Sequence, residues 1–292
     1  MKEFTVVLYA GGVDSRMSEL TSTIPKCLLP IGNRPLIWYT LKLLEINGCQ
    51  ECLILTSPQY RTSLDDYLSS LTLTLKYELL THHHSGQTSE DDEIGTLDVL
   101  RPIYAKIKYE NLLLLTCDLF GKINLNVMIN MFRIKNASLV LLLTKSPFNK
   151  ETSVPGQKGR FRQGKFPRLS IRADLCDGHI YLIKKSCLDY AIRSNYSSLR
   201  KQFIPKMIRN LASGDVLLDL NNEPKQKTMS RQKTTDYDVQ NDLTSILEKY
   251  EINNDNVQQN GCYSYIQDTP VAYRIKNIVS FVEANRQVNY QI

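Results

Sequence analysis

The stretch that decides the fold is FTVVLYAGGVDSRMSELTSTIPKCLLPIGNRPL, which runs from Phe4 to Leu36. It opens with a near-continuous apolar run, which predicts a strand buried on both faces. Gly11 and Gly12 then allow the backbone to turn sharply. Ligands of α/β sheets bind where parallel strands end, so the following loop is a candidate phosphate cradle, to which Arg16 and Lys26 add positive charge. An ordinary strand-ending turn explains the glycine pair equally well.

Beyond this stretch, apolar runs alternate with helical periodicity, which predicts an α/β fold. We expect a Rossmann-like, doubly wound, mostly parallel sheet with helices on both faces. Asn33 is predicted as the N-cap region of the first long helix, with Pro35 in its first turn. The predicted strands are 4–10, 52–56, 72–80, 111–116, 137–144 and 177–182, with 262–266 and 271–275 pairing with each other; the predicted helices are 36–46, 58–70, 95–107, 127–135, 186–194, 203–211 and 278–286.

Composition bounds the class of protein. The chain has 292 residues, of which 42% are hydrophobic, enough for a sizeable core. A net charge of +6 permits an acidic partner without requiring one. No apolar run approaches the roughly 20 residues of a membrane span, so we expect no membrane association and a cytosolic protein. An odd number of cysteines, seven, favours reduced thiols over a disulfide framework.

The predicted domain organisation is a single domain over residues 1–292, with a doubly wound core over 1–145. The segment 146–172 is predicted as a basic loop, because glycine, proline and basic residues accumulate there. Such a loop could bind RNA, but the short supply of aromatic residues favours a solvated loop, so direct nucleic-acid binding is not expected. The polar segment 221–242 is predicted as a flexible linker.

Several isolated motifs have a structural and a functional interpretation. Cys49 and Cys52 form a C-x-x-C, but no second pair accompanies them, so core packing is favoured over a metal or redox site. The run His82 to His84 is interpreted as a solvated loop rather than a metal site. His179 is interpreted as a packed or hydrogen-bonded strand residue rather than a catalytic base.

Asp118 follows the very apolar run Asn111 to Thr116. A carboxylate just beyond a buried strand points into the same crevice as the glycine loop, where it could hold Mg²⁺ against phosphate oxygens. Its side chain could equally cap the next turn. The residues alone leave both interpretations open.

The run from Ala10 to Ile37 resembles the signature of the sugar-phosphate nucleotidyltransferases, roughly G-G-x-G-T-R-L-x-P-L-T-x-x-x-P-K-P. The resemblance implies the nucleotide-diphospho-sugar transferase fold. A wider set of segments is similar to one branch of that superfamily, the gamma subunits of the guanine-nucleotide-exchange factor for eukaryotic translation initiation factor 2. The segments are TSTIPKCLLPIGNRPLIWYTLKLLE, Gly95-Thr96, LLLLTCDL, VPGQKG, DGHIYLIKK, LRKQFIPKMIR and EANRQV.

This resemblance implies a regulatory and scaffolding domain of protein biosynthesis. In that family the gamma subunit pairs with the epsilon subunit, which carries the exchange activity, and works with the other subunits on initiation factor 2. The full subunits continue into a left-handed β-helix, so this chain is expected to be the N-terminal domain without that β-helix. An isolated domain of an obligate assembly can also form homodimers.

The resemblance also implies where a nucleotide site would lie and how it has changed. The matching residues give a vestigial phosphate site and a vestigial metal ligand in Asp118. Asp14 stands where the enzymes have a third glycine, and at about 4 Å each unit of repulsion with a triphosphate costs roughly 4 kcal/mol. Ser15 replaces a threonine, Cys117 replaces a glycine, and no W-x-D-x-G-T segment supplies a second metal ligand. The vestigial phosphate site comprises Gly11, Gly12, Asp14, Ser15, Arg16, Lys26, Gly95 and Thr96.

We therefore predict a pseudoenzyme with no catalytic residues, no bound metal and no cofactor. The alternative is an active Mg²⁺-dependent sugar-phosphate nucleotidyltransferase. It would bind nucleoside triphosphate through Lys26 and Asp118.

Overall fold

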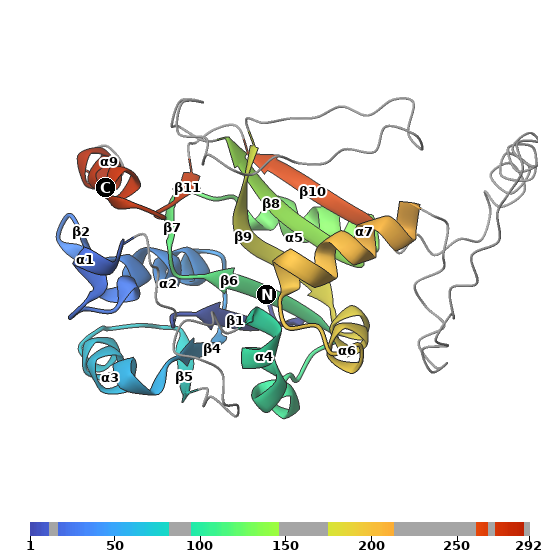
Figure 1. Cartoon of the computed structure of the whole chain (residues 1–292), viewed down its shortest axis with the longest axis horizontal. Helices are drawn as coiled ribbons and strands as arrows, with labels where there is room; N and C mark the ends of the chain where they lie inside the picture. The colour runs from blue at the N-terminus through green and yellow to red at the C-terminus, as the bar shows by residue number, and fades with distance from the viewer. Residues whose placement is uncertain (12–16, 82–94, 146–174, 213–260, 268–271, 289–292) are drawn as a thin grey trace, which may run out of the picture.

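The computed structural model describes residues 1–11, 17–81, 95–145, 175–212, 261–267 and 272–288. Its centre is a seven-stranded sheet in the order β10-β8-β9-β6-β1-β4-β5 (Figure 1). Strand β1 (Phe4–Tyr9) pairs in parallel with β4 (Glu51–Thr56) and with β6 (Asn111–Thr116). Strand β9 (Leu175–Lys184) is antiparallel to both of its neighbours. The sheet is therefore mostly parallel, as the sequence predicts.

The remaining elements follow in chain order. The strands are β2 (Pro30–Ile31), β3 (Arg34–Pro35), β5 (Lys76–Thr81), β7 (Leu119–Gly121), β8 (Leu139–Lys145), β10 (Cys262–Gln267) and β11 (Ala272–Arg274). The helices are α1 (Ser18–Thr21), η2 (Lys26–Leu28), α2 (Leu36–Ile46), η3 (Pro58–Tyr60), α3 (Arg61–Ser69), α4 (Thr96–Leu100), η4 (Arg101–Lys106), α5 (Leu125–Ile134), α6 (Lys185–Arg193), η7 (Leu199–Phe203), α7 (Ile204–Ala212) and α9 (Ile278–Gln287).

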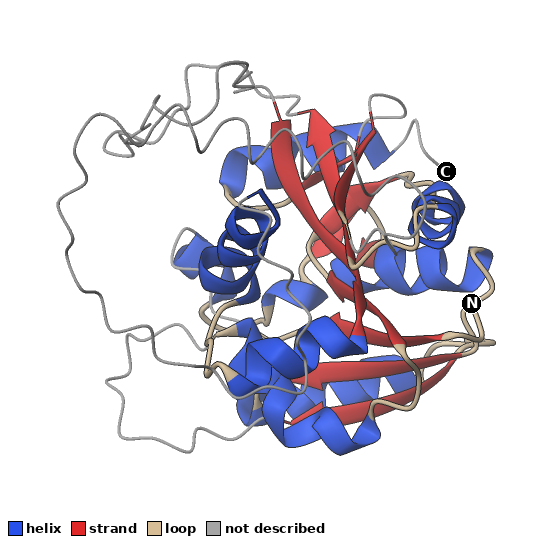
Figure 2. Ribbon diagram, turned by 90° about the vertical axis from the view of Figure 1, so that its right-hand side faces the viewer, coloured by secondary structure: helices blue, strands red, loops and turns tan. Residues whose placement is uncertain are grey.

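Helices cover both faces of the sheet (Figure 2). One core cluster joins alternate strand residues to α2, α3 and α5, and the other joins the intervening strand residues to α4, η4, α6, η7 and α7. In β1, for example, Val6 belongs to the first cluster and Val7 to the second. This two-sided burial explains why the central strands are apolar at nearly every position.

Most predicted elements are confirmed, including β1, β4, β6 and the helices over 36–46 and 278–286. The predicted helix over 95–107 divides into α4 and η4, with Pro102 at the start of the second part. Pro102 has no backbone N–H to donate within an α-helix, which accounts for this change. The strand predicted over 72–80 begins only at Lys76.

Two sequence predictions are wrong. Strands β10 and β11 do not pair with each other: β10 adds to β8 in parallel, and β11 pairs antiparallel with β7. The N-cap of α2 is Pro35, while Asn33 lies in the turn between the short strands β2 and β3. The first error concerns pairing between distant segments, whereas the second is local, because residues 30–35 form a short hairpin directly before α2.

A third, smaller core forms beside the main sheet. Phe120 of β7 contacts Tyr39 and Tyr273 in edge-to-face arrangements, with ring centroids 5.3 and 6.0 Å apart. Ala284 of α9 packs into the same cluster. Through this core the C-terminal residues 272–288 are held against the end of β6, where the candidate site lies.

Some predicted features lie outside the described residues. These are the loop 12–16, the histidine run 82–84, the basic loop 146–172 and the linker 221–242. Among the helices that the structure does describe, none is both long and apolar enough to cross a membrane. The sheet itself continues past residue 145, since β9 and β10 complete it.

Candidate functional site

The candidate site lies where β1 and β6 end, and its centre is the buried carboxylate of Asp118. Lys26 Nζ donates to Asp118 Oδ2 at 3.0 Å. Arg274 donates from Nε to Oδ1 at 3.0 Å and from Nη2 to Oδ2 at 2.5 Å. The Thr116 hydroxyl donates to Oδ1 at 2.6 Å. Both carboxylate oxygens are therefore held by charged or hydroxyl donors from three separate segments.

The backbone fixes each member of this cluster. Asp118 directly follows β6, and its carbonyl accepts from Ile275 N at 2.8 Å, which ties β11 to the end of the sheet. Lys26 opens the short 3₁₀-helix η2 after the extended Pro25. The lysine is only 9% exposed, so its ammonium is directed inward rather than toward bulk water.

Electrostatics keep Asp118 ionised. Burial alone would raise the pKa of this carboxyl, but the adjacent Arg274 and Lys26 cations hold the pKa well below its usual value. In return, the carboxylate raises the pKa of Arg274 against the opposing effect of burial. The cluster is thus a fully charged, buried ion network at neutral pH.

His179 extends the network. Its Nε2 lies 2.8 Å from Arg274 Nη1. Because a guanidinium only donates, the imidazole accepts at Nε2 and is neutral, with its proton on Nδ1. Burial, and after it the Arg274 charge, lower the pKa of His179 to about 4. The sequence predicts a packed or hydrogen-bonded strand residue, and the structure agrees: the His179 side chain is 15% exposed and belongs to this polar network.

A backbone irregularity brings His179 into this position. The pairing of β8 and β9 shifts register between Leu141 and Leu143, and His179 has a φ of +54°. A β-bulge of this kind re-aims one side chain, and strained residues of this type collect at functional sites. Gly178 permits the close approach, since a Cβ there would lie 2.7 Å from Leu142 Cδ2.

Asp177 forms the outer end of the network. It accepts from the His179 backbone N–H at 2.8 Å and from the Tyr181 hydroxyl at 2.6 Å. Arg200 of η7 lies 3.2 Å from the same carboxylate and is half exposed. A chain of polar and charged contacts thus leads from the surface at Arg200, through Asp177, His179 and Arg274, to the buried Asp118.

Gly11 has a packing role in the structure. A Cβ on this residue would lie 2.9 Å from the backbone nitrogen of Ser57 and 3.1 Å from Thr56 Cα. Only glycine fits where the ends of β1 and β4 approach so closely. The other loop residues of the predicted phosphate site, Gly12, Asp14, Ser15 and Arg16, lie outside the described residues.

Gly95 and Thr96 hold a neighbouring segment of the chain. A Cβ on Gly95 would collide with Ser197. Leu97 N donates to the Ser197 carbonyl at 2.9 Å, and Leu199 N donates to Thr96 Oγ1 at 2.9 Å. These residues are therefore engaged by the segment that leads into η7.

The sequence identified Lys26 and Asp118, and the structure brings these two together. The sequence did not point to Arg274, which lies 156 residues from Asp118 along the chain. Within the described part of the chain, no cluster of three or more histidine, cysteine, aspartate or glutamate residues is arranged to hold a metal ion. Cys49 and Cys52 are buried in the main core, and burial raises the pKa of both thiols, which agrees with a packing role.

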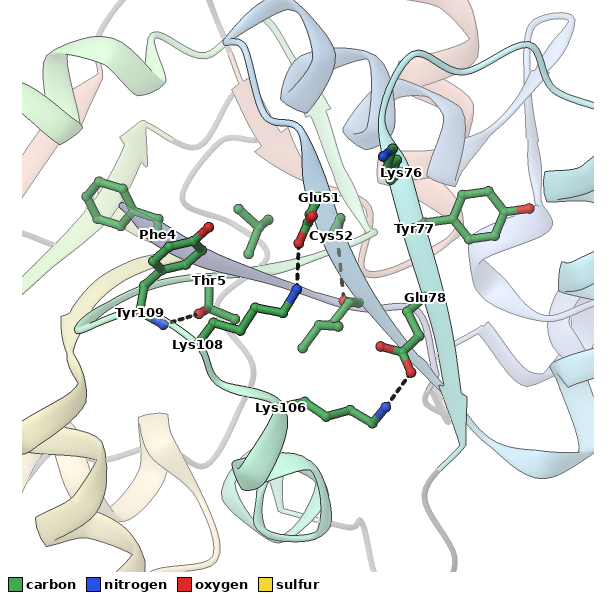
Figure 3. Close-up of a pocket in the computed structure, with 12 residues that line it drawn as sticks. Phe4, Thr5, Glu51, Cys52, Lys76, Tyr77, Glu78, Lys106, Lys108 and Tyr109 are labelled. Carbon is green, nitrogen blue, oxygen red and sulfur yellow. Dashed lines mark hydrogen bonds and ion pairs between the residues drawn. The ribbon is translucent and has the colours of Figure 1, made fainter. Parts of the chain in front are cut away.

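A separate pocket of about 200 Å³ opens at the opposite end of the strands, where β1, β4 and β5 begin (Figure 3). Two ion pairs bridge it: Lys108 to Glu51 at 2.8 Å, and Lys106 to Glu78. All four side chains are about half exposed, so water screens these charges. Its buried polar residue Thr5 already accepts from Tyr109 N at 3.1 Å, and we therefore assign the candidate site to the Asp118 end of the sheet.

Comparisons with known proteins agree with this architecture. Translation initiation factor eIF2B subunit gamma of Caenorhabditis elegans is 24% identical over 242 residues, covering 71% of this chain and 58% of that protein. The corresponding subunit of Schizosaccharomyces pombe is 25% identical over 242 residues, covering 71% of this chain and 51% of its own. These matches confirm the gamma-subunit resemblance found in the sequence. The chain spans only about half to three fifths of these relatives.

Sugar-nucleotide enzymes are also similar to this chain. Glucose-1-phosphate cytidylyltransferase of Salmonella typhimurium is 26% identical over 84 residues, covering 27% of this chain and 33% of the enzyme. The crystal structure of HddC from Yersinia pseudotuberculosis aligns with a TM-score of 0.58 at 13% identity, covering 97% of this chain and 99% of that one. At that identity the likeness shows the fold alone. Residues 5–153, half of the chain, match the Nucleotidyl transferase family, and the chain belongs to that family.

Proposed function

We propose that this chain is a non-catalytic domain of the gamma subunit of the guanine-nucleotide-exchange factor for translation initiation factor 2. It acts in the cytosol as a regulatory and scaffolding element together with the epsilon subunit. Two matches to gamma subunits support this assignment, because each covers 71% of the chain. Two cytidylyltransferase matches cover 45% and 27% of it.

The observation that carries the proposal is the state of the Asp118 carboxylate. Nucleotidyltransferases of this family use Mg²⁺ held by two aspartates, and Mg²⁺ needs oxygen ligands at about 2.0–2.1 Å. Here Lys26, Arg274 and Thr116 already hold both oxygens of Asp118. The residues that the structure describes do not fit the ion, because a cation would have to displace a buried guanidinium and would gain only the Asp118 carboxylate from among them.

The second support comes from Gly95 and Thr96. In the resemblance these residues belong to the vestigial nucleotide site, yet the backbone and side chain of Ser197 pack directly on Gly95. The hydroxyl oxygen of Thr96 accepts a hydrogen bond from the Leu199 N–H. A base or ribose could reach these groups only if the segment 197–199 moved away, which favours a structural role for both residues.

A surface on α9 supports a role in assembly. Ile278, Val279 and Val282 are all exposed, Val279 at 59%. They occupy positions i, i+1 and i+4 of α9, a helix at the periphery of the fold (Figure 1), while Ala284 packs inward. Adjacent exposed β-branched side chains are costly in water and mark protein contacts. A scaffold subunit needs such a surface.

Reconstitution tests the proposal. The chain, co-expressed with the epsilon subunit, is expected to co-purify with it and to alter nucleotide exchange on initiation factor 2. The same chain is expected to release no pyrophosphate from nucleoside triphosphates, sugar 1-phosphates and Mg²⁺. Failure to retain the epsilon subunit would contradict the proposal.

An active nucleotidyltransferase is the second candidate. It is favoured by the retention of Lys26 and Asp118 at 3.0 Å from each other, at the edge of the sheet where this fold class binds ligands. This candidate predicts Mg²⁺-dependent pyrophosphate release that a chelator abolishes. A pyrophosphate assay across several nucleotides and sugar 1-phosphates separates the two candidates.

A further inference from the structure

The closest contact in the candidate site is between Arg274 and Asp118. The guanidinium donates to both carboxylate oxygens in a two-point arrangement. The side chains are 13% and 5% exposed, so water scarcely weakens the pair. Paired donors of this type bind a carboxylate strongly and in one defined orientation.

The position of Arg274 is fixed by the C-terminal segment. Arg274 ends β11, which pairs with β7 immediately after Asp118, and Ile275 N donates to the Asp118 carbonyl. Backbone hydrogen bonds therefore place the guanidinium against the carboxylate. Nothing in this arrangement requires an external ion.

A divalent cation on Asp118 would need more anionic oxygen than this pocket offers. The other acid of the network, Asp177, is taken up by Arg200, Tyr181 and the His179 backbone. Among the residues that the structure describes, the charges directly around Asp118 are Lys26 and Arg274, so these surroundings carry a net charge of about +1, and a dication would be repelled.

We propose that Arg274 is a resident counter-ion that takes the place of a divalent cation on Asp118. It makes the crevice independent of metal and locks the C-terminal segment onto the sheet. This inference rests on the proposed non-catalytic function of the same crevice, and it names the residue responsible. It implies that Arg274→Asp turns the pocket into a cation site, because two carboxylates and the Thr116 hydroxyl then face Lys26 alone.

The test is a titration of the full chain with Mn²⁺ at neutral pH, in which isothermal calorimetry measures the affinity. Arg274→Asp is expected to bind Mn²⁺ at least about tenfold more tightly than the wild type. Arg274→Asn removes the same guanidinium without supplying a carboxylate and is expected to show a smaller gain. Arg286→Asp is the matched control: it makes the same charge change at a 75% exposed position of α9 and is expected to leave Mn²⁺ affinity at the wild-type level.

Thermal unfolding with and without Mn²⁺ keeps the test decisive if Arg274→Asp is weakly folded. Mn²⁺ is then expected to raise the melting temperature of Arg274→Asp and, by less, that of Arg274→Asn. No gain in affinity or melting temperature in either variant overturns the inference while the non-catalytic function stands. Tight Mn²⁺ binding by the wild type, equal to that of Arg274→Asp, overturns both.

Discussion

At the level of single residues, Asp118 is the charge on which two buried cations depend. Asp118→Asn keeps the shape of the side chain but leaves Lys26 and Arg274 without their shared anion. Breaking a buried ion pair from one side costs about 3–5 kcal/mol, so we expect a loss of that size in the free energy of unfolding. Urea denaturation measures it. Asp66→Asn, at an exposed position of α3, is the control and is expected to change stability by less than about 0.5 kcal/mol. An equal effect of both variants would contradict the role given to Asp118.

His179 gives the network a predictable response to pH. Its pKa is about 4 in the folded chain and ordinarily 6.5, so the unfolded chain binds the extra proton first. Stability is therefore complete above pH 6.5 and is lost as the pH falls from 6.5 toward 4. A shift of this size corresponds to roughly 3 kcal/mol.

Urea unfolding at a series of pH values tests this response. His179→Gln, which keeps an acceptor for Arg274 but does not titrate, is expected to flatten the curve between pH 6.5 and 4. The stability that Asp118 contributes is lost only below about pH 4, where the carboxyl of the unfolded chain starts to bind protons, and the loss continues to still lower pH because the folded pKa is well below the usual value. If the free energy of unfolding of His179→Gln falls with pH as steeply as that of the wild type, groups other than His179 cause the loss of stability.

At the level of elements, α9 connects the site to the third core. Its N-cap, Asn277, accepts from Ser280 N at 2.9 Å, and the Ser280 hydroxyl accepts in return from Asn277 N at 3.1 Å. Asn277→Ala removes one half of this capping box, for which a loss of about 1 kcal/mol is typical. Thermal unfolding measures it. Asn130→Ala, at an exposed interior position of α5, should be neutral or slightly stabilising, because alanine is the better helix former.

The elements also show what the sequence can and cannot predict. The continuous apolar run of β6 predicts its bounds correctly, because burial on both faces leaves a clear local signal. The three-residue strand β7 is too short to show any periodicity, and the pairing of β11 depends on it. Lys26 and Asp118 could be found because each belongs to a recognisable motif. Arg274 could not, since only the folded chain brings it to Asp118.

At the scale of the whole molecule, the described residues combine a buried ion network around Asp118 with an exposed apolar surface on α9. The charged groups around Asp118 pair with one another, so this network offers few unpaired charges to a ligand. Meanwhile α9 leaves Ile278, Val279 and Val282 exposed at the periphery of the fold (Figure 1). Buried charges that are paired with one another, together with apolar side chains exposed at the periphery, are the arrangement expected of a subunit that functions by assembly.

The α9 surface supplies the last prediction. Val279→Asp combined with Val282→Asp places two charges on the exposed stripe without touching Ala284 or the third core. We expect the melting temperature to stay within a few degrees of the wild type, since surface substitutions usually cost little, while retention of the epsilon subunit falls by about tenfold or more. Quantitative pull-down measures the retention. Val127→Asp combined with Ile134→Asp, on the exposed face of α5, is the matched control and should retain the partner. Loss of the partner in the control alone would move the assembly surface from α9 to α5.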